Sequence, residues 1–292
     1  MKFEGIIPAL VTPLNSDETV NVEVLKSLVE YLLKEKADGL YVGGATGEGI
    51  ALSAKERMVL AEASIDATKG EKPCIIHIAS ANFNEAVELA KHAESVGAAG
   101  ISAIPPLFFK YDEDDVYNYY KRLAESVNIP LMIYFNPAAG FNINAKFAAR
   151  AFEVDNITAI KWTSSNYYEM IKLKDMTNGE MNIINGPDEM LLMGLNAGAD
   201  GGIGTTYNFM MSNIRAVYDN FKAGNVEKAQ MAQTEADRII DALLKYMGIP
   251  ATKVVLEEMG FAVGNSVFPM KRYTTEEKAQ IVADMRKAGL KI

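Results

Sequence analysis

Lys161 is the residue with the most distinctive chemical setting in this sequence. It lies near the end of a run of β-branched and apolar residues, 157–160, that is typical of a buried strand. Burial makes an amine easier to deprotonate, and a neutral amine attacks carbonyl carbons. A lysine at a strand end can also extend its charged group to solvent and do no chemistry. Taken alone, this run favours neither interpretation over the other.

Two other segments carry groups that suit carbonyl chemistry. Tyr134 ends an apolar run, and a phenol beside a Schiff-base carbon can pass protons to and from a hydroxyl. The loop 43–48, Gly-Gly-Ala-Thr-Gly-Glu, has glycines that let backbone amides approach a carboxylate, with the Thr46 hydroxyl as a further donor. The structural alternatives are an aromatic side chain that fills a barrel mouth and an ordinary tight turn.

Asp188 and Glu189 form an adjacent carboxylate pair just after a third apolar run, 181–185. Carboxylates in this position accept hydrogen bonds from ligand hydroxyls or cap the helix that follows. We expect Asp188 to cap this helix, which is compatible with a role in ligand binding.

The composition limits the classes to which the chain can belong. Its 292 residues are 49% hydrophobic and 23% charged, with a mean hydropathy of +0.00, as is typical of a soluble globular protein with an ample core. A net charge of −9 gives no sign of a nucleic-acid-binding surface. The single Cys74 is expected to be a buried thiol. His77, on a strand, and His92, on the surface of a helix, lack the spacing of a metal site.

The N-terminal residues show no signal-peptide pattern, and no apolar stretch is long enough to span a membrane. We therefore expect no membrane partner and a cytoplasmic location.

These candidate residues need elements to position them, and the chain alternates short β-type runs with amphipathic helical runs. Eight strand–helix units with nearly continuous apolar strands predict an α/β fold, a parallel TIM (β/α)8 barrel. The strands are expected at residues 5–12, 39–44, 73–79, 100–105, 130–135, 158–163, 181–185 and 201–205. The helices are expected at residues 22–35, 54–67, 84–96, 113–127, 145–152, 166–176, 189–197 and 211–223.

A strand-free tail follows the eighth unit. Its helices are expected at residues 226–247, 251–258 and 275–287, with a helix cap at Thr274. We expect residues 1–225 to form the catalytic barrel and residues 226–292 to form a C-terminal three-helix extension packed on it. No flexible linker separates the two parts, so the tail is not expected to fold alone.

In such a barrel the chemistry collects at the carboxyl ends of the strands. This rule selects Thr12, the loop 43–48, Tyr134, Lys161, Thr163, Asp188, Glu189 and Thr205. It also makes Tyr134 and Lys161 neighbours, because they end consecutive strands.

Four segments together resemble the class I aldolase superfamily that contains N-acetylneuraminate lyase and dihydrodipicolinate synthase. They span the barrel and read GGATGE at 43–48, YFNP at 134–137, IKWT at 160–163 and GADGGIGTTYN at 198–208. The resemblance implies that Lys161 forms an imine with pyruvate and that Tyr134 shuttles protons. The amides of Ala45 and Thr46, with the Thr46 hydroxyl, would hold the pyruvate carboxylate. No metal or organic cofactor is implied, because the lysine imine is itself the electron sink.

The stretch after the catalytic tyrosine bears on the branch of the superfamily. Dihydrodipicolinate synthases usually carry an arginine shortly after the proline that follows this tyrosine, whereas residues 137–140 here are Pro-Ala-Ala-Gly. A site that lacks the guanidinium fork should bind a second carboxylate poorly.

A second group of residues is similar to the sialic acid lyase pattern. By that resemblance the Gly186 carbonyl, Asp188, Glu189 and the Thr205 hydroxyl would contact the polyhydroxy tail of a sugar acid. Thr163 would contact a hydroxyl near the cleaved bond. The implied activity is reversible cleavage of N-acetylneuraminate to N-acetylmannosamine and pyruvate.

Two positions depart from the superfamily pattern. Position 45 is usually serine or threonine and here is Ala45, and the position near Phe109 often carries a tyrosine that reaches a neighbouring subunit's site. In relatives these hydroxyls relay protons to the catalytic tyrosine. Our hypothesis is that Tyr134 works instead with the substrate carboxylate or a water.

Other functions stay open at this point. The chain could be another pyruvate-dependent aldolase, a dihydrodipicolinate synthase-like enzyme, or a non-catalytic ligand-binding barrel kept for regulation. The presence of both Lys161 and Tyr134 argues against the last of these. Relatives are commonly tetramers, so the resemblance also implies a homotetramer.

Overall fold

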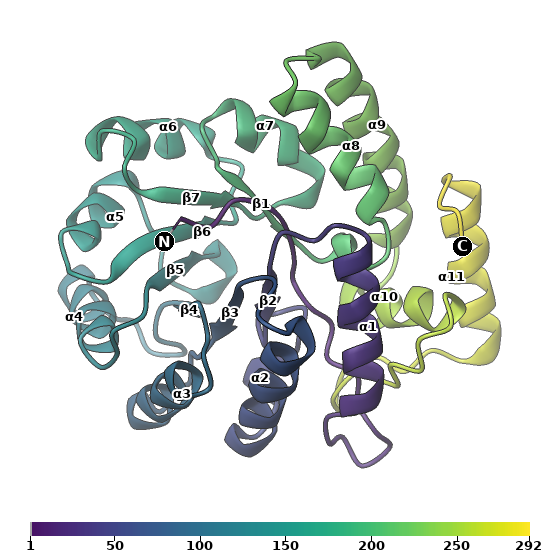
Figure 1. Cartoon of the computed structure of the whole chain (residues 1–292), viewed down its shortest axis with the longest axis horizontal. Coiled ribbons are helices and arrows are strands. Elements are labelled where there is room, and N and C mark those ends of the chain that lie inside the picture. Colours follow the sequence, from purple (N-terminus) through teal and green to yellow (C-terminus); the bar gives the residue numbers. More distant parts are fainter. Residues whose placement is uncertain (1) are drawn as a thin grey trace.

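Eight parallel strands form the centre of the molecule in the computed structural model, which describes residues 2–292 (Figure 1). The apolar runs that predicted them are buried along almost their whole length, as expected for strands covered on both sides. The strands are β1 (Gly5–Pro8), β2 (Leu40–Val42), β3 (Cys74–His77), β4 (Gly100–Ala103), β5 (Leu131–Phe135), β6 (Ile157–Trp162), β7 (Asn182–Asn185) and β8 (Gly201–Gly204).

The strands follow one another around the sheet in the order β1-β8-β7-β6-β5-β4-β3-β2. The two ends of this sheet meet in a parallel bridge between Ala9 and Tyr41, and Leu10 N donates to Tyr41 O at 2.8 Å. This closure confirms the predicted TIM barrel. Most strands end one or more residues earlier than predicted, β1 at Pro8 rather than at Thr12, because the chain turns into site loops there.

Helices surround the strands, as the alternating pattern predicts (Figure 1). They are α1 (Val22–Lys34), α2 (Ala54–Thr68), α3 (Phe83–Ser95), α4 (Glu113–Ala124), α5 (Ala145–Phe152), α6 (Tyr167–Met176), α7 (Leu191–Asn196) and α8 (Met211–Lys222). Short 3-10 turns, η1 (Gly49–Ala51), η2 (Pro137–Ala139), η3 (Asp188–Met190) and η4 (Thr206–Asn208), follow strands β2, β5, β7 and β8.

Three further helices follow α8: α9 (Val226–Leu243), α10 (Gly248–Glu258) and α11 (Thr275–Lys287). Figure 1 shows α9 alongside α8, with α10 and α11 on the same side of the barrel. The predicted cap of the last helix is confirmed, since Thr274 and Glu277 form a capping box. The long helix predicted over 226–247 ends at Leu243, and the next begins at Gly248 rather than at Ala251.

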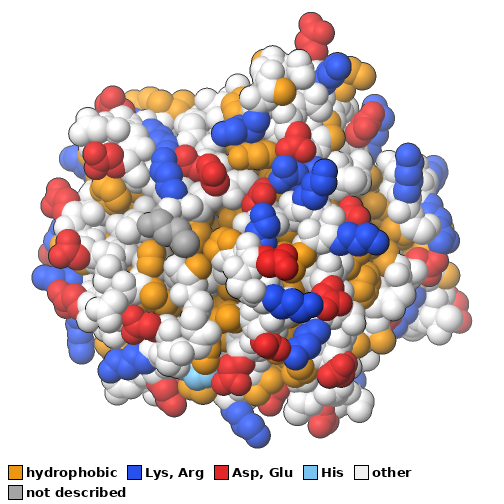
Figure 2. All heavy atoms as spheres, in the orientation of Figure 1, with side chains coloured by type: hydrophobic (Ala, Val, Ile, Leu, Met, Phe, Trp, Pro, Cys, Tyr) orange, Lys and Arg blue, Asp and Glu red, His pale blue; other side chains and the backbone are white. Residues whose placement is uncertain are grey.

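The core and the surface can be compared with the predictions made from the composition. Cys74 is buried, as predicted. Within residues 2–292, no helix is both long and apolar enough to cross a membrane. On the face drawn in Figure 2, acidic and basic side chains are interspersed rather than gathered in a patch of one sign.

Candidate active site

Lys161 and Tyr134 lie side by side near the carboxyl ends of β6 and β5, whose register pairs the two residues directly. Both are almost fully buried, with 5% and 4% of their surfaces exposed. Lys161 Nζ lies over the Tyr134 ring, 4.3 Å from its centroid, and 4.6 Å from that of Tyr41. Aromatic faces attract a cation, so these rings accommodate a charged nitrogen inside the barrel. Lys161 is therefore not a lysine that reaches solvent.

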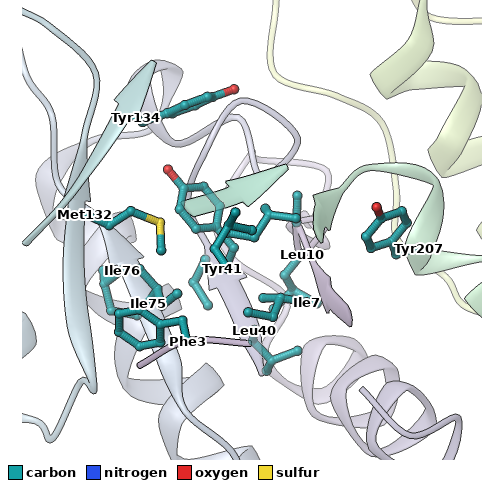
Figure 3. Packing of buried hydrophobic residues seen from close by; sticks show 14 of the residues in the cluster. Phe3, Ile7, Leu10, Leu40, Tyr41, Ile75, Ile76, Met132, Tyr134 and Tyr207 are labelled. Atoms are coloured by element: carbon teal, nitrogen blue, oxygen red, sulfur yellow. The ribbon is translucent and has the colours of Figure 1, made fainter. Parts of the chain in front are cut away.

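Two further buried side chains support this pair. Tyr41, on β2, has its ring edge-on to Tyr134 (Figure 3). Its hydroxyl donates to Ser102 Oγ at 3.0 Å. His77, on β3, also packs edge-on against Tyr134. Burial, together with the charges of Arg57 and Lys161, holds the pKa of His77 well below its ordinary value, so its imidazole is neutral. Sequence reasoning did not select Tyr41, and the only signal for its role is a hydroxyl group within an apolar strand.

The glycine-rich loop after β2 forms a tight turn. Gly43 has a φ of +69°, and a side chain at Gly49 would overlap the backbone of Gly43. The Glu48 amide donates to the Ala45 carbonyl at 3.0 Å, which closes the turn around residues 45 and 46. The Thr12 hydroxyl donates to the Gly47 carbonyl at 2.6 Å, so the segment after β1 also holds this loop. Such a compact loop can present backbone amides to an anion.

Two predicted binding residues meet across the barrel mouth. Thr46 and Thr205 bring their hydroxyl oxygens to 2.6 Å, which links the loop after β2 to the turn after β8. Thr46 is buried and Thr205 is partly exposed, whereas Ala45 is exposed and brings no hydroxyl. The structure thus brings the expected carboxylate cradle and one expected sugar contact together.

The expectation that Asp188 caps a helix is wrong. Pro187 precedes the 3-10 turn η3, and Asp188 Oδ2 instead accepts hydrogen bonds from the Thr206 amide and hydroxyl, at 2.8 and 2.7 Å. Burial raises the pKa of Asp188 from its ordinary 3.8 to about 6, against the lowering effect of these hydrogen bonds. Asp188 therefore ties the turn after β7 to the turn after β8.

Thr163 and Gly186 are also in contact. A side chain at Gly186 would lie 2.0 Å from Thr163 Oγ1, so only glycine fits there without displacing the threonine. Thr163 Oγ1 is buried and has no hydrogen-bond partner among residues 2–292. A buried hydroxyl of this kind has a donor and acceptor available to a ligand.

A cavity of about 460 Å³ opens beside these residues. Its lining includes Gly186, Asp188, Glu189 and Thr205, the residues predicted to contact a sugar tail. It also includes Thr163, which is predicted to contact a hydroxyl near the cleaved bond. An apolar wall of the cavity comes from the C-terminal extension: Ile240, Leu243, Leu244, Gly248 and Ile249. The sequence did not predict this wall, because an amphipathic pattern shows that a helix has an apolar face but not which part of the protein that face will contact.

The segment after β4 does not line this cavity. Phe108 and Phe109 are 93% and 69% exposed, and Phe108 has a φ of +77°. Neither provides a hydroxyl, and the tyrosine of this loop is Tyr111. Tyr111, three residues beyond Phe108, lines a separate hollow with Phe109.

Within residues 2–292, no three histidine, cysteine, aspartate or glutamate side chains gather as they would around a metal ion. His92 instead pairs with Glu62, with Nε2 and Oε1 2.8 Å apart.

Comparison with known proteins places this arrangement in a family. The profile of the Dihydrodipicolinate synthetase family matches residues 2–288. The chain belongs to that family. The N-acetylneuraminate lyase of Rhizobium meliloti is 34% identical over 283 residues, which cover 97% of this chain and 93% of that protein.

Solved structures of family members overlay closely on the chain. Proteus mirabilis N-acetylneuraminate lyase is 31% identical, with a TM-score of 0.95 over 99% of this chain and 100% of that one. A dihydrodipicolinate synthase from Bacillus anthracis gives a TM-score of 0.93 at 26% identity, over 98% of each chain. The fold is therefore common to both branches of the family, and the substrate has to be argued from the site.

Proposed function

We propose that this protein is a Schiff-base aldolase that cleaves N-acetylneuraminate reversibly into N-acetylmannosamine and pyruvate. The observation that carries the proposal is the in-register pair of Lys161 and Tyr134, buried at the carboxyl ends of neighbouring strands. Relatives named N-acetylneuraminate lyase that are 30–34% identical to the chain support the choice of substrate.

In the proposed first step, Lys161 Nζ attacks the C2 carbonyl carbon of the open-chain sugar acid. The carbonyl oxygen takes one proton from Nζ and one from the Tyr134 hydroxyl and leaves as water, which leaves an iminium that links Nζ to C2 and a Tyr134 phenolate. The rings of Tyr41 and Tyr134 face this cation. The amides of Ala45 and Thr46, with the Thr46 hydroxyl, hold the adjacent carboxylate.

Tyr134 then takes the proton of the C4 hydroxyl while the C3–C4 bond breaks. The electron pair of that bond moves into the iminium, which becomes an enamine, and the aldehyde form of N-acetylmannosamine leaves. Protonation at C3 and addition of water release pyruvate and free Lys161. Gly186, Asp188, Glu189, Thr205 and Thr163 line the cavity that receives the sugar tail.

The second candidate is an aldolase of the same family that acts on a different pyruvate-derived acid. The 3-10 turn η2, at Pro137–Ala139, carries no arginine, which disfavours a partner with a second carboxylate. The apolar wall of the cavity suits an acyl or methylene group better than a charged one.

Product analysis with three substrates tests the proposal. The protein is incubated with N-acetylneuraminate, with 2-keto-3-deoxygluconate, and with pyruvate plus aspartate semialdehyde. We expect N-acetylmannosamine and pyruvate from the first, with a kcat/KM at least about tenfold above the others. A higher kcat/KM for either alternative would reassign the substrate, and no turnover of any would favour a non-catalytic barrel.

We also propose an oligomeric state, a cellular location and a domain organisation for the enzyme. The family resemblance supports a homotetramer, and the exposed Phe108 and Phe109 are suited to an interface between copies. A cytoplasmic location fits a substrate and product that are small polar metabolites. We further propose that residues 1–225 act as the catalytic unit and that residues 226–292 fold only when packed on it.

A further inference from the structure

A buried ion pair joins the glycine-rich loop to the C-terminal helices. Lys253 Nζ, on α10, lies 2.7 Å from Glu48 Oε1, and the two side chains are 2% and 0% exposed. Lys253 also donates to the Asn265 carbonyl at 3.0 Å, and the Val267 amide donates to Glu48 Oε2 at 2.7 Å. Both oxygens of Glu48 are therefore held by residues more than 200 positions away in the chain.

Glu48 has a left-handed backbone conformation, which a glutamate adopts only when its surroundings hold it there. Its φ of 56° lies in the left-handed region, which is uncommon for residues other than glycine, asparagine and aspartate. Its amide also closes the turn on the Ala45 carbonyl. A change in the position of Glu48 would thus move the peptide groups of Ala45 and Thr46, the pair assigned to the pyruvate carboxylate.

A stabilising role alone does not account for this arrangement. A buried ion pair is costly to desolvate, and an apolar pair of similar volume often stabilises a protein as well or better. Charged, hydrogen-bonded pairs do fix the geometry of what they join. The Glu48 carboxylate contacts Lys253 and accepts from the Val267 amide at the same time, which anchors the end of the loop.

We propose that the Glu48–Lys253 ion pair is a positioning device by which the C-terminal extension sets the affinity of the barrel for the carboxylate of a 2-oxo acid. The inference rests on the proposed function, because it assigns this carboxylate to the loop amides. Glu48 and Lys253 are positioning residues, since they act through Ala45 and Thr46.

The test measures imine formation with pyruvate in the full-length protein. Borohydride traps the imine, and intact-mass spectrometry gives the trapped fraction at each pyruvate concentration. The variants are Lys253→Met, Glu48→Gln and the double variant Glu48→Gln/Lys253→Met, which restores an uncharged pair of similar size. Lys174→Met is the matched control, because Lys174 pairs with Asp200 at 3.2 Å near the start of β8, at the opposite end of the strands.

We expect each single variant to raise the half-saturating pyruvate concentration about tenfold. The trapped fraction at saturation and kcat per trappable site should stay within about threefold of wild type. The double variant should recover most of the affinity, and Lys174→Met should lower the melting temperature alone. If Lys253→Met does not fold, Glu48→Gln and the double variant carry the same comparison.

An unchanged half-saturating concentration in the single variants, with only a lower melting temperature, would overturn the inference. An absence of any trapped adduct in wild type would instead overturn the proposed function.

Discussion

In our proposal Tyr134 transfers protons, and the hydroxyl that the family resemblance leads us to expect at position 45 is replaced here by Ala45. Ala45 is exposed at the mouth of the barrel, and Tyr41 gives its own hydroxyl proton to Ser102 rather than to Tyr134. A catalytic phenol needs a partner from which it can recover a proton. In this chain that partner is, in our hypothesis, the substrate carboxylate or a water.

Replacing Ala45 with serine tests this hypothesis. We expect kcat to rise about tenfold, a modest share of what a positioned acid–base group contributes, with pyruvate affinity unchanged within about threefold. Ala45→Val is the control, since it adds bulk without a hydroxyl. Steady-state kinetics and imine trapping separate the two effects. A large loss of pyruvate affinity with unchanged kcat would contradict the hypothesis.

We expect Asp188 to make a pH-dependent contribution to stability. Its pKa is about 6 in the folded protein, against an ordinary 3.8. A carboxyl with a raised folded-state pKa stabilises the protein fully below the unfolded-state value, and this contribution is lost as pH rises through the folded-state value. The loss therefore falls between pH 4 and 6 and amounts to about 3 kcal/mol.

Asp188→Asn should remove this pH dependence. The asparagine oxygen still accepts from the Thr206 amide and hydroxyl, so the turn is retained. We expect the stability of the variant relative to wild type to increase by about 3 kcal/mol between pH 4 and pH 7. Urea unfolding at several pH values measures this difference. A difference that stays constant with pH would mean that Asp188 titrates normally.

The turn after β7 depends on the absence of a side chain at one position. Gly186 packs directly against Thr163, and its amide donates to the Trp162 carbonyl at 2.8 Å. We expect Gly186→Ala to cost about 1–3 kcal/mol in unfolding free energy, because Thr163 must move. It should also lower kcat/KM for the sugar acid.

Gly248 provides the matched control for this substitution. It lines the same cavity, and an added Cβ would meet nothing within 4 Å. Gly248→Ala should leave stability unchanged or slightly higher, since alanine favours the helix that begins there. Equal losses in the two variants would show that the close packing at Gly186 is not the cause.

At the level of elements, the features that could be predicted from the sequence are those that local sequence patterns determine. Alternating apolar runs and amphipathic helices predict the barrel, and consecutive strand ends predict the contact between Tyr134 and Lys161. The partner of Asp188 was not predictable, because Thr206 is brought to it by the closure of β7 on β8. The same holds for Glu48 and Lys253, which meet only through packing of α10.

The C-terminal extension contributes the apolar wall of the candidate substrate cavity. Leu244, just after α9, lies on the apolar wall and is 65% exposed, so its replacement should have little effect on the core. In the proposed mechanism pyruvate reacts at Lys161, which does not line this cavity, and so pyruvate does not need the apolar wall. A full-length sugar acid would have atoms that extend into the cavity.

Leu244→Glu should therefore lower kcat/KM for N-acetylneuraminate about tenfold while imine formation with pyruvate stays normal. Met231→Glu is the control, because Met231 lies on α9 with the same 65% exposure and does not line the cavity. Parallel kinetics and trapping give both values. If the two variants behave alike, the extension does not contact the sugar tail.

The most direct measurement of the whole account is the identification of the residue that bonds to pyruvate. The protein is incubated with pyruvate, reduced with borohydride and digested, and the modified peptide is sequenced by mass spectrometry. We predict one adduct, on Lys161, that is absent from Lys161→Met and present in Tyr134→Phe. An adduct on another lysine, or none at all, would contradict the assignment of this barrel as a Schiff-base aldolase.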